Sequence, residues 1–239
     1  MQNKGISQGI GIGIFICIGL IGLGYFLGTS ALKFKSFERS VTVKGLSERE
    51  VPADIALWPI TMSAAGNDLV ALHAKLDKDS KRVITFLEKH GLEEPEISVN
   101  APSITDKLAQ EYGGQNNVRF RYVATKTMNV YSTKVDLVRK TMSDLGELLG
   151  EGIVFKVQDY GSRPQYLFTG LNDIKPGMVE EATRNAREVA RKFAQDSKSV
   201  LGKIKRARQG QFSITPRDAH TPYIKKVRVV STVEYYLSD

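Results

Sequence analysis

The pattern of apolar and polar residues after residue 40 alternates between strand and helix periods. A period of two predicts strands at about 41–45, 53–64, 96–101, 118–131, 153–160, 165–169, 203–214 and 226–237. The last of these alternates most regularly, with Val227, Val229 and Val233 on one face and mainly charged or polar residues on the other. Polar residues at 47–50 predict a turn between the first two strands, and the segment 106–117 predicts a loop.

Helical spacing predicts three helices between these strands. The first follows an N-cap at Asn67, the second opens with Thr133 and Asp136, and the third runs from near Pro176 to Gly202. The expected buried stripe of the third helix is mostly small: Ala182, Ala186, Ala190, Ala194, Val189 and Phe193. Strand pairs separated by single helices predict an α+β fold, with a mainly antiparallel sheet or sheets and helices packed on one side.

An uncharged apolar segment precedes this domain. No charged residue lies between Lys4 and Lys33. As a helix, residues 5–32 would be about 42 Å long, more than the ~30 Å hydrocarbon core of a bilayer requires. We predict a transmembrane anchor over residues 1–32, a linker over 33–40 and the domain over 41–239, with a division into two lobes near residue 132 left open.

The apolar segment has two other interpretations. Thr29-Ser30-Ala31 resembles a signal-peptide cleavage site, but the apolar core of a signal peptide is usually only about 7–15 residues. A buried core helix is disfavoured because the segment has no polar face. A retained membrane helix is therefore the prediction, with cleavage as the alternative.

Glycines recur at four-residue intervals within the apolar segment: Gly5, Gly9, Gly13 and then Gly24, Gly28. This spacing places small residues on one helix face, where a second helix can approach closely. We therefore expect a packing contact in the membrane, the alternative being that glycine is merely tolerated in lipid.

Positive charge follows the apolar segment. Residues 33–239 carry 33 basic and 26 acidic side chains, a net charge of +7. Four basic residues near the C-terminus form a possible surface for an anionic lipid or polymer: Lys203, Lys205, Arg206 and Arg208. The alternative is an ordinary solvated strand face.

No catalytic, cofactor or metal site is evident from the residues. The single cysteine, Cys17, lies in the apolar segment, so the domain has no thiol for a disulfide, a nucleophile or a metal ligand. The three histidines, at positions 73, 90 and 220, are widely separated, and no phosphate-binding loop or nucleophile elbow is present. We expect a protein that is not an enzyme; a catalytic site assembled from distant residues is the alternative.

Several short motifs resemble a known family. Residues 41–45 (VTVKG) and 51–56 (VPADIA) resemble the opening of SIMPL-domain proteins, except that Ala53 is inserted where the family more often has Pro-Asp adjacent. Residues 121–124 (RYVA) look like the family's Tyr-x-Ala stretch, and the helix from Glu181 to Leu201-Gly202 looks like its alanine-rich helix. The resemblance covers about residues 40–237.

This resemblance implies location and assembly more than chemistry. SIMPL-domain proteins are mostly exported bacterial envelope proteins; some are linked to oxidative-stress defence, and some assemble into large rings or channel-like oligomers. By resemblance we expect a periplasmic or extracytoplasmic domain that forms a large homo-oligomer, with a stress-protective role. The expected partners are membrane lipid and further copies of the chain; nucleic acid is not favoured, and the residues identify no small-molecule substrate.

Orientation in the membrane is the point on which charge and resemblance disagree. Lys33, Lys35 and Arg39 follow the apolar segment, and counting positive charges would place the domain in the cytoplasm. The resemblance implies the opposite side, and we follow the resemblance.

Overall fold

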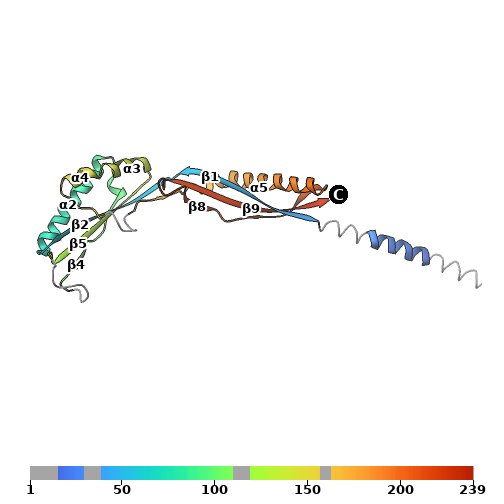
Figure 1. Ribbon diagram of the computed structural model, residues 1–239, viewed down its shortest axis with the longest axis horizontal. Coiled ribbons are helices and arrows are strands. Elements are labelled where there is room, and N and C mark those ends of the chain that lie inside the picture. Colours follow the sequence, from blue (N-terminus) through green and yellow to red (C-terminus); the bar gives the residue numbers. More distant parts are fainter. Residues whose placement is uncertain (1–15, 30–38, 110–118, 157–162, 239) are drawn as a thin grey trace, which may run out of the picture. The chain divides into compact units, whose positions relative to one another are not determined.

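The computed structural model describes residues 16–29, 39–109, 119–156 and 163–238 (Figure 1). The chain forms two compact units. Unit 1 comprises Met1–Glu48, Pro176–Phe212 and Arg228–Asp239, and unit 2 comprises Arg49–Lys175 and Ser213–Val227. Residue 132, near which the sequence left a division open, lies within unit 2. The units are interleaved along the chain, so that no single cut in the sequence separates them.

Sheet A supplies most of unit 1. Its strands are β1 (Ser40–Pro52), β9 (Ile224–Ser238) and β7 (Val200–Gln209) in that spatial order, with β8 (Ser213–Pro216) also paired to β9. β7 is antiparallel to β9. The Leu237 N–H donates to the Arg39 carbonyl, and Glu48 contacts Arg228, so β1 is antiparallel to β9 as well. The prediction of an α+β fold with antiparallel sheets is confirmed.

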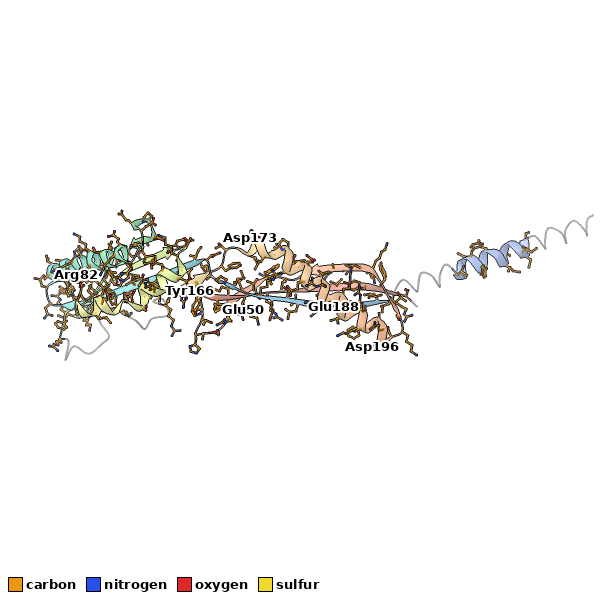
Figure 2. The ribbon with its side chains drawn as sticks, turned by 90° about the horizontal axis from the view of Figure 1, so that it is seen from above. Glu50, Arg82, Tyr166, Asp173, Glu188 and Asp196 are labelled. Atoms are coloured by element: carbon orange, nitrogen blue, oxygen red, sulfur yellow. The ribbon has the colours of Figure 1, made fainter. Side chains whose placement is uncertain are left out.

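Helix α5 (Leu171–Asp196) covers one face of sheet A within unit 1 (Figure 1). Its alanine stripe is buried as expected: Ala182, Ala186, Ala190 and Ala194. Beneath it lie alternate residues of β9, including Val229, Val233 and Tyr235, which confirms the period-two pattern of that strand. Figure 2 marks Glu188 and Asp196 on this helix.

Gly45 of β1 permits the close packing of α5. A Cβ atom at this position would lie 1.8 Å from the Ala182 carbonyl oxygen and 2.5 Å from the Ala186 nitrogen. Both neighbours are backbone atoms, which cannot rotate away as a side chain could. The close contact between β1 and α5 therefore requires both glycine at position 45 and small side chains on the helix.

Three expectations for this helix are wrong. Val189 and Phe193 are 39% and 54% exposed, because each precedes a buried alanine and so lies about 100° around the helix from it. The helix begins at Leu171 and contains Pro176, so this proline is not at its start. It ends at Asp196, and Gly202 belongs to β7, where chain pairing with β9 has already begun.

Sheet B forms the framework of unit 2. Its strands are ordered β3 (Ile97–Val99), β5 (Tyr122–Ser132), β2 (Ile55–Gly66) and β6 (Gln165–Leu167), with β4 (Ser103–Asp106) also paired to β5. Helices α2 (Leu69–Lys89), α3 (Val135–Ser143) and α4 (Gly146–Gly150) lie on one side of β2 and β5 (Figure 1), and η1 (Glu94–Glu96) precedes β3. The core between them includes Trp58, Phe86 and Met128.

Local polar contacts overturn two predicted boundaries. The turn at 47–50 is absent, because Ser47 is buried and donates to Glu181 of α5 (2.9 Å), which keeps β1 extended to Pro52. The N-cap of α2 is Asp68, whose carboxylate accepts from Val70 and Ala71 N–H. Asn67 instead accepts the Arg121 N–H.

Other differences concern α3 and two segments that are only partly described. Lys134, rather than Thr133, is the N-cap of α3, without a side-chain capping bond. The expected loop at 106–117 begins within β4, and residues 110–118 lie outside the described residues. Of the strand expected at 153–160, an isolated bridge between Phe155 and Met62 is found, and residues 157–162 are not described.

Candidate functional site

The basic residues singled out by the sequence lie on β7. Lys203, Lys205, Arg206 and Arg208 belong to this strand, and nine of its ten residues are exposed. The strand pairs with β9 on one side, and no described strand pairs with its other side. The structure therefore places the predicted cationic surface on an open edge of sheet A.

The backbone polarity of this edge follows from the pairing with β9. The Gly210 N–H donates to the Val230 carbonyl (2.9 Å), and the same register pairs Arg208 with Thr232 and Ala207 with Val233. Hydrogen-bonded and non-hydrogen-bonded residues alternate along an antiparallel pair. The N–H groups of Ala207 and Gln209 consequently point away from β9, toward the open edge.

The opposite edge of sheet A, at β1, is partly closed by α5. By the same alternation, the Leu46 carbonyl points away from β9, and Asn185 of α5 donates to it (2.8 Å). The bond between Ser47 and Glu181 holds the helix at the same edge. Among the described residues, α5 therefore contacts the β1 edge of sheet A, and no strand pairs with the β7 edge.

A β-bulge brings Lys205 onto the face of sheet A that is opposite α5, here called the outer face. The register of β7 shifts between Leu201 and Ile204 and again between Ile204 and Arg206. Lys205 Nζ lies 3.0 Å from Glu234 Oε1 and 5.7 Å from the Tyr236 ring centroid. A hydrogen bond from Ser40 (2.7 Å) and the Lys205 ammonium together hold the pKa of Glu234 below its usual range.

A hollow of about 190 Å³ opens on the outer face beside this ion pair. It is lined by one residue of β1, two of β9 and two of β7: Thr42, Thr232, Glu234, Arg206 and Arg208. Sequence reasoning found the two arginines but missed both threonines and Glu234. The only signal for them was the period-two pattern, which puts them on the same face once the strand order is known.

A larger hollow, of about 390 Å³, lies between α2 and α4 in unit 2. Its walls carry charges of both signs, including Lys78, Lys89, Glu147 and Glu151. Arg82 and Glu151 approach each other to 3.9 Å across it; Arg82 is marked in Figure 2. Lys81 and Arg82 line it as well, so four basic and two acidic side chains face this hollow, whereas the hollow on sheet A adds two threonine hydroxyls to its charged groups.

The histidines do not come together in the structure. His73 pairs with Asp77 within α2 (3.2 Å), His90 faces Asp144 (3.6 Å), and the His220 backbone N–H donates to Asp218. Among the described residues there is no group of three or more His, Cys, Asp or Glu that could hold a metal ion.

The apolar segment is described only over residues 16–29, which are helical. No helix in the described part of the chain is both long enough and apolar enough to cross a bilayer. Gly5, Gly9 and Gly13 lie outside the described residues, and nothing lies within 4 Å of a Cβ built on Gly24 or Gly28.

The chain thus forms two interleaved α+β units, each with an antiparallel sheet and helices on one face of that sheet. Residues 41–235 match the family model SIMPL, described as a protein of unknown function (DUF541). The match covers most of the chain, which therefore belongs to the SIMPL family. The search among curated proteins found no match.

Proposed function

We propose that this SIMPL-family chain is a non-enzymatic, membrane-anchored envelope protein that assembles with further copies of itself through the β7 edge of sheet A. The open edge is the observation that carries the proposal. In the described part of the chain, no strand pairs with the side of the ten-residue β7 that faces away from β9, whereas the β1 edge is partly closed by α5. A strand edge with unpaired backbone groups is a template for pairing with another chain, whereas basic side chains and bulges of the kind found on β7 oppose promiscuous pairing.

The composition of the N-terminal segment supports the membrane anchor. It has no charge between Lys4 and Lys33, and its helical part exposes large apolar side chains, among them Leu20, Tyr25 and Phe26 at 63–72%. An apolar surface of this kind is stable when lipid or another apolar helix covers it. The extracytoplasmic location and the stress-protective role rest on what the family resemblance implies.

Exposed apolar side chains on β7 also favour contact with a second copy of the chain. Val200 is 61% exposed and Ile204 is 40% exposed, although the neighbouring strand β9 buries its alternate apolar residues. Pairing with a second copy would cover these side chains as well as the backbone. The basic residues of the strand would then set which partner strands are tolerated, because like charges directly opposite each other are destabilising.

A proline at position 207 tests this edge selectively. The Ala207 N–H points away from β9, so Ala207→Pro removes a donor of the open edge and leaves the β7–β9 hydrogen bonds in place. The matched control, Ala207→Ser, keeps the N–H at the same exposed site. Light scattering of the full-length protein in mild detergent should show large assemblies for the native chain and the serine variant.

The proline variant should remain folded by circular dichroism and give a much smaller species. Assembly of Ala207→Pro to the native size would refute the β7 contact. A native chain that is monomeric at all protein concentrations would refute self-assembly altogether.

A further inference from the structure

Positive charge is concentrated in unit 1. Its described residues include 12 Lys and Arg against 6 Asp and Glu, a net charge of +6, whereas the described residues of unit 2 include 19 against 16, a net charge of +3. Unit 1 is the smaller of the two in described length. The chain's excess of basic residues is therefore mainly a property of the unit that contains β7 and most of sheet A.

The outer face of sheet A arranges its polar groups in cross-strand rows. Arg206 lies opposite Glu234, and Arg208 lies opposite Thr232. Extending the β1–β9 register from the Arg39–Leu237 hydrogen bond places Thr42 beside Glu234 on the other side. The side chains of all five residues line the hollow of about 190 Å³ described above.

The cations of this hollow exceed its anions. Its one carboxylate, Glu234, already accepts from Ser40 and pairs with Lys205. Arg206 contributes to the lowered pKa of Glu234 but forms no ion pair within 4.0 Å in the described part of the chain, and Arg208 has no carboxylate partner there. Two guanidinium groups thus stand beside a carboxylate whose charge is already compensated.

The donors of the hollow define the chemistry of a ligand. Arginine presents its N–H groups as a planar fork that matches the oxygen atoms of phosphate, and threonine hydroxyls can donate to the same group. The hollow is smaller than the roughly 300–1,000 Å³ of pockets that enclose drug-sized ligands. It fits one oxyanion group better than a whole cofactor.

The position of unit 1 in the chain indicates the source of that group. Ten residues, 30–39, join the helical residues 16–29 to β1, and even a fully extended linker of this length spans at most roughly 35 Å. If the apolar segment lies in a bilayer, as proposed above, this tether holds unit 1 close to lipid headgroups. Their phosphates are then present at high local concentration.

We infer that the hollow formed by Thr42, Thr232, Arg206 and Arg208 is a phosphate-binding site that takes the headgroup of an anionic phospholipid. The phosphate chemistry rests on the geometry of sheet A alone. The lipid source additionally rests on the proposed membrane anchor.

The test uses the full-length protein in a neutral detergent and two probes, inorganic phosphate and phosphatidylglycerol. Phosphatidylcholine, whose phosphate is balanced by its own choline cation, serves as the zwitterionic lipid comparison. Binding is measured by the shift of the thermal unfolding midpoint with probe concentration and by phosphorus NMR line broadening. Light scattering on the same samples reports assembly, so that failure of the phosphate site and failure of self-assembly are recognised separately.

The key variant is Arg206→Gln with Arg208→Gln. Its matched control is Arg187→Gln with Arg191→Gln, which removes the same charge from exposed positions on α5 in the same unit. The β7 variant should weaken binding of both probes by about 10- to 100-fold, because each lost charge-assisted hydrogen bond is costly. The α5 variant should bind like the native protein, and lysines at 206 and 208 should restore binding only in part.

The possible outcomes distinguish a phosphate site from attraction by net charge. Binding of both probes that is lost only in the β7 variant supports the inference. Binding of phosphate without phosphatidylglycerol overturns the lipid source. Absence of binding to the native protein, or an equal loss in the α5 variant, overturns the site, because the attraction would then be one of net charge.

Discussion

Substitution of Gly45 by alanine should push α5 away from sheet A and destabilise unit 1. The new Cβ would lie 1.8 Å from the Ala182 oxygen, and real Cβ contacts are essentially never shorter than 3.0 Å, so the helix must move by about 1.2 Å. Overpacking usually costs about 1–3 kcal/mol, and here the displaced atoms are backbone. Moving the helix also opens gaps under Ala186 and Ala190, which adds a cavity cost. We expect a loss of about 3 kcal/mol or more in the free energy of unfolding.

Two optical signals separate the affected unit from the other. Far-UV circular dichroism follows the helices of both units, whereas fluorescence of Trp58, the only tryptophan, reports the core of unit 2. In urea, Gly45→Ala should lose part of its helical signal at lower denaturant concentration, while the Trp58 transition stays near that of the native protein. Because both units share β1, β9 and α5 along the chain, a simultaneous shift of both signals would mean that they unfold together.

Gly150→Ala is the matched control. Gly150 is the last residue of α4, and nothing lies within 4 Å of a Cβ built there. Its effect should stay within about 0.5 kcal/mol, as for other surface changes. A Gly45→Ala protein as stable as this control would refute the close contact between β1 and α5.

Two further predictions concern carboxylates of unit 2. Asp54 accepts from the Thr169 N–H (2.7 Å), the Thr169 hydroxyl (2.8 Å) and the Gly170 N–H (3.1 Å). Asp54→Ala should therefore cost about 2 kcal/mol in urea unfolding followed by Trp58, whereas Asp136→Ala, at a side chain that is 94% exposed, should cost about 0.5 kcal/mol or less. Asp218 accepts from the Thr221 hydroxyl and pairs with Arg217, and these contacts hold its pKa well below the usual range. Because the pKa of Asp218 is lower in the folded than in the unfolded protein, its ionised carboxylate stabilises the fold at pH values above the unfolded pKa of about 3.9. This stabilisation is lost progressively as the pH falls below that value. Asp218→Asn should thus lower the melting temperature at neutral pH, and the difference from the native protein should shrink below about pH 4; a difference that is constant with pH would contradict this.

The period-two pattern of the strands and the alanine spacing of the last helix predicted which faces of these elements are buried. Val227 to Tyr235 and the Ala182–Ala194 stripe were assigned to their faces correctly, because one buried face per element leaves a strong periodic trace in the sequence. Boundaries were predicted less well. Ser47 reads as a turn residue, yet its hydroxyl is satisfied by Glu181, a partner 134 residues away that local reasoning cannot supply.

The candidate site shows the same division. Arg206 and Arg208 stand out as a basic cluster in the sequence, but Thr42 and Thr232 are ordinary strand residues until strands β1, β9 and β7 are placed side by side. Lys205 belonged to the same predicted cluster, and the bulge turns it toward Glu234. A bulge is a tertiary adjustment of one strand to its neighbour, so the alternation of side chains does not reveal it.

The sequence by itself determined the apolar N-terminal segment, the α+β class and the faces of the most regular elements, because each depends on hydrophobic periodicity within a short stretch. Only the tertiary structure decided which edge of sheet A is guarded and which is open, and which polar residues share the hollow on its outer face. Those properties depend on contacts between residues more than 130 positions apart, such as Leu46 with Asn185 and Ser40 with Glu234.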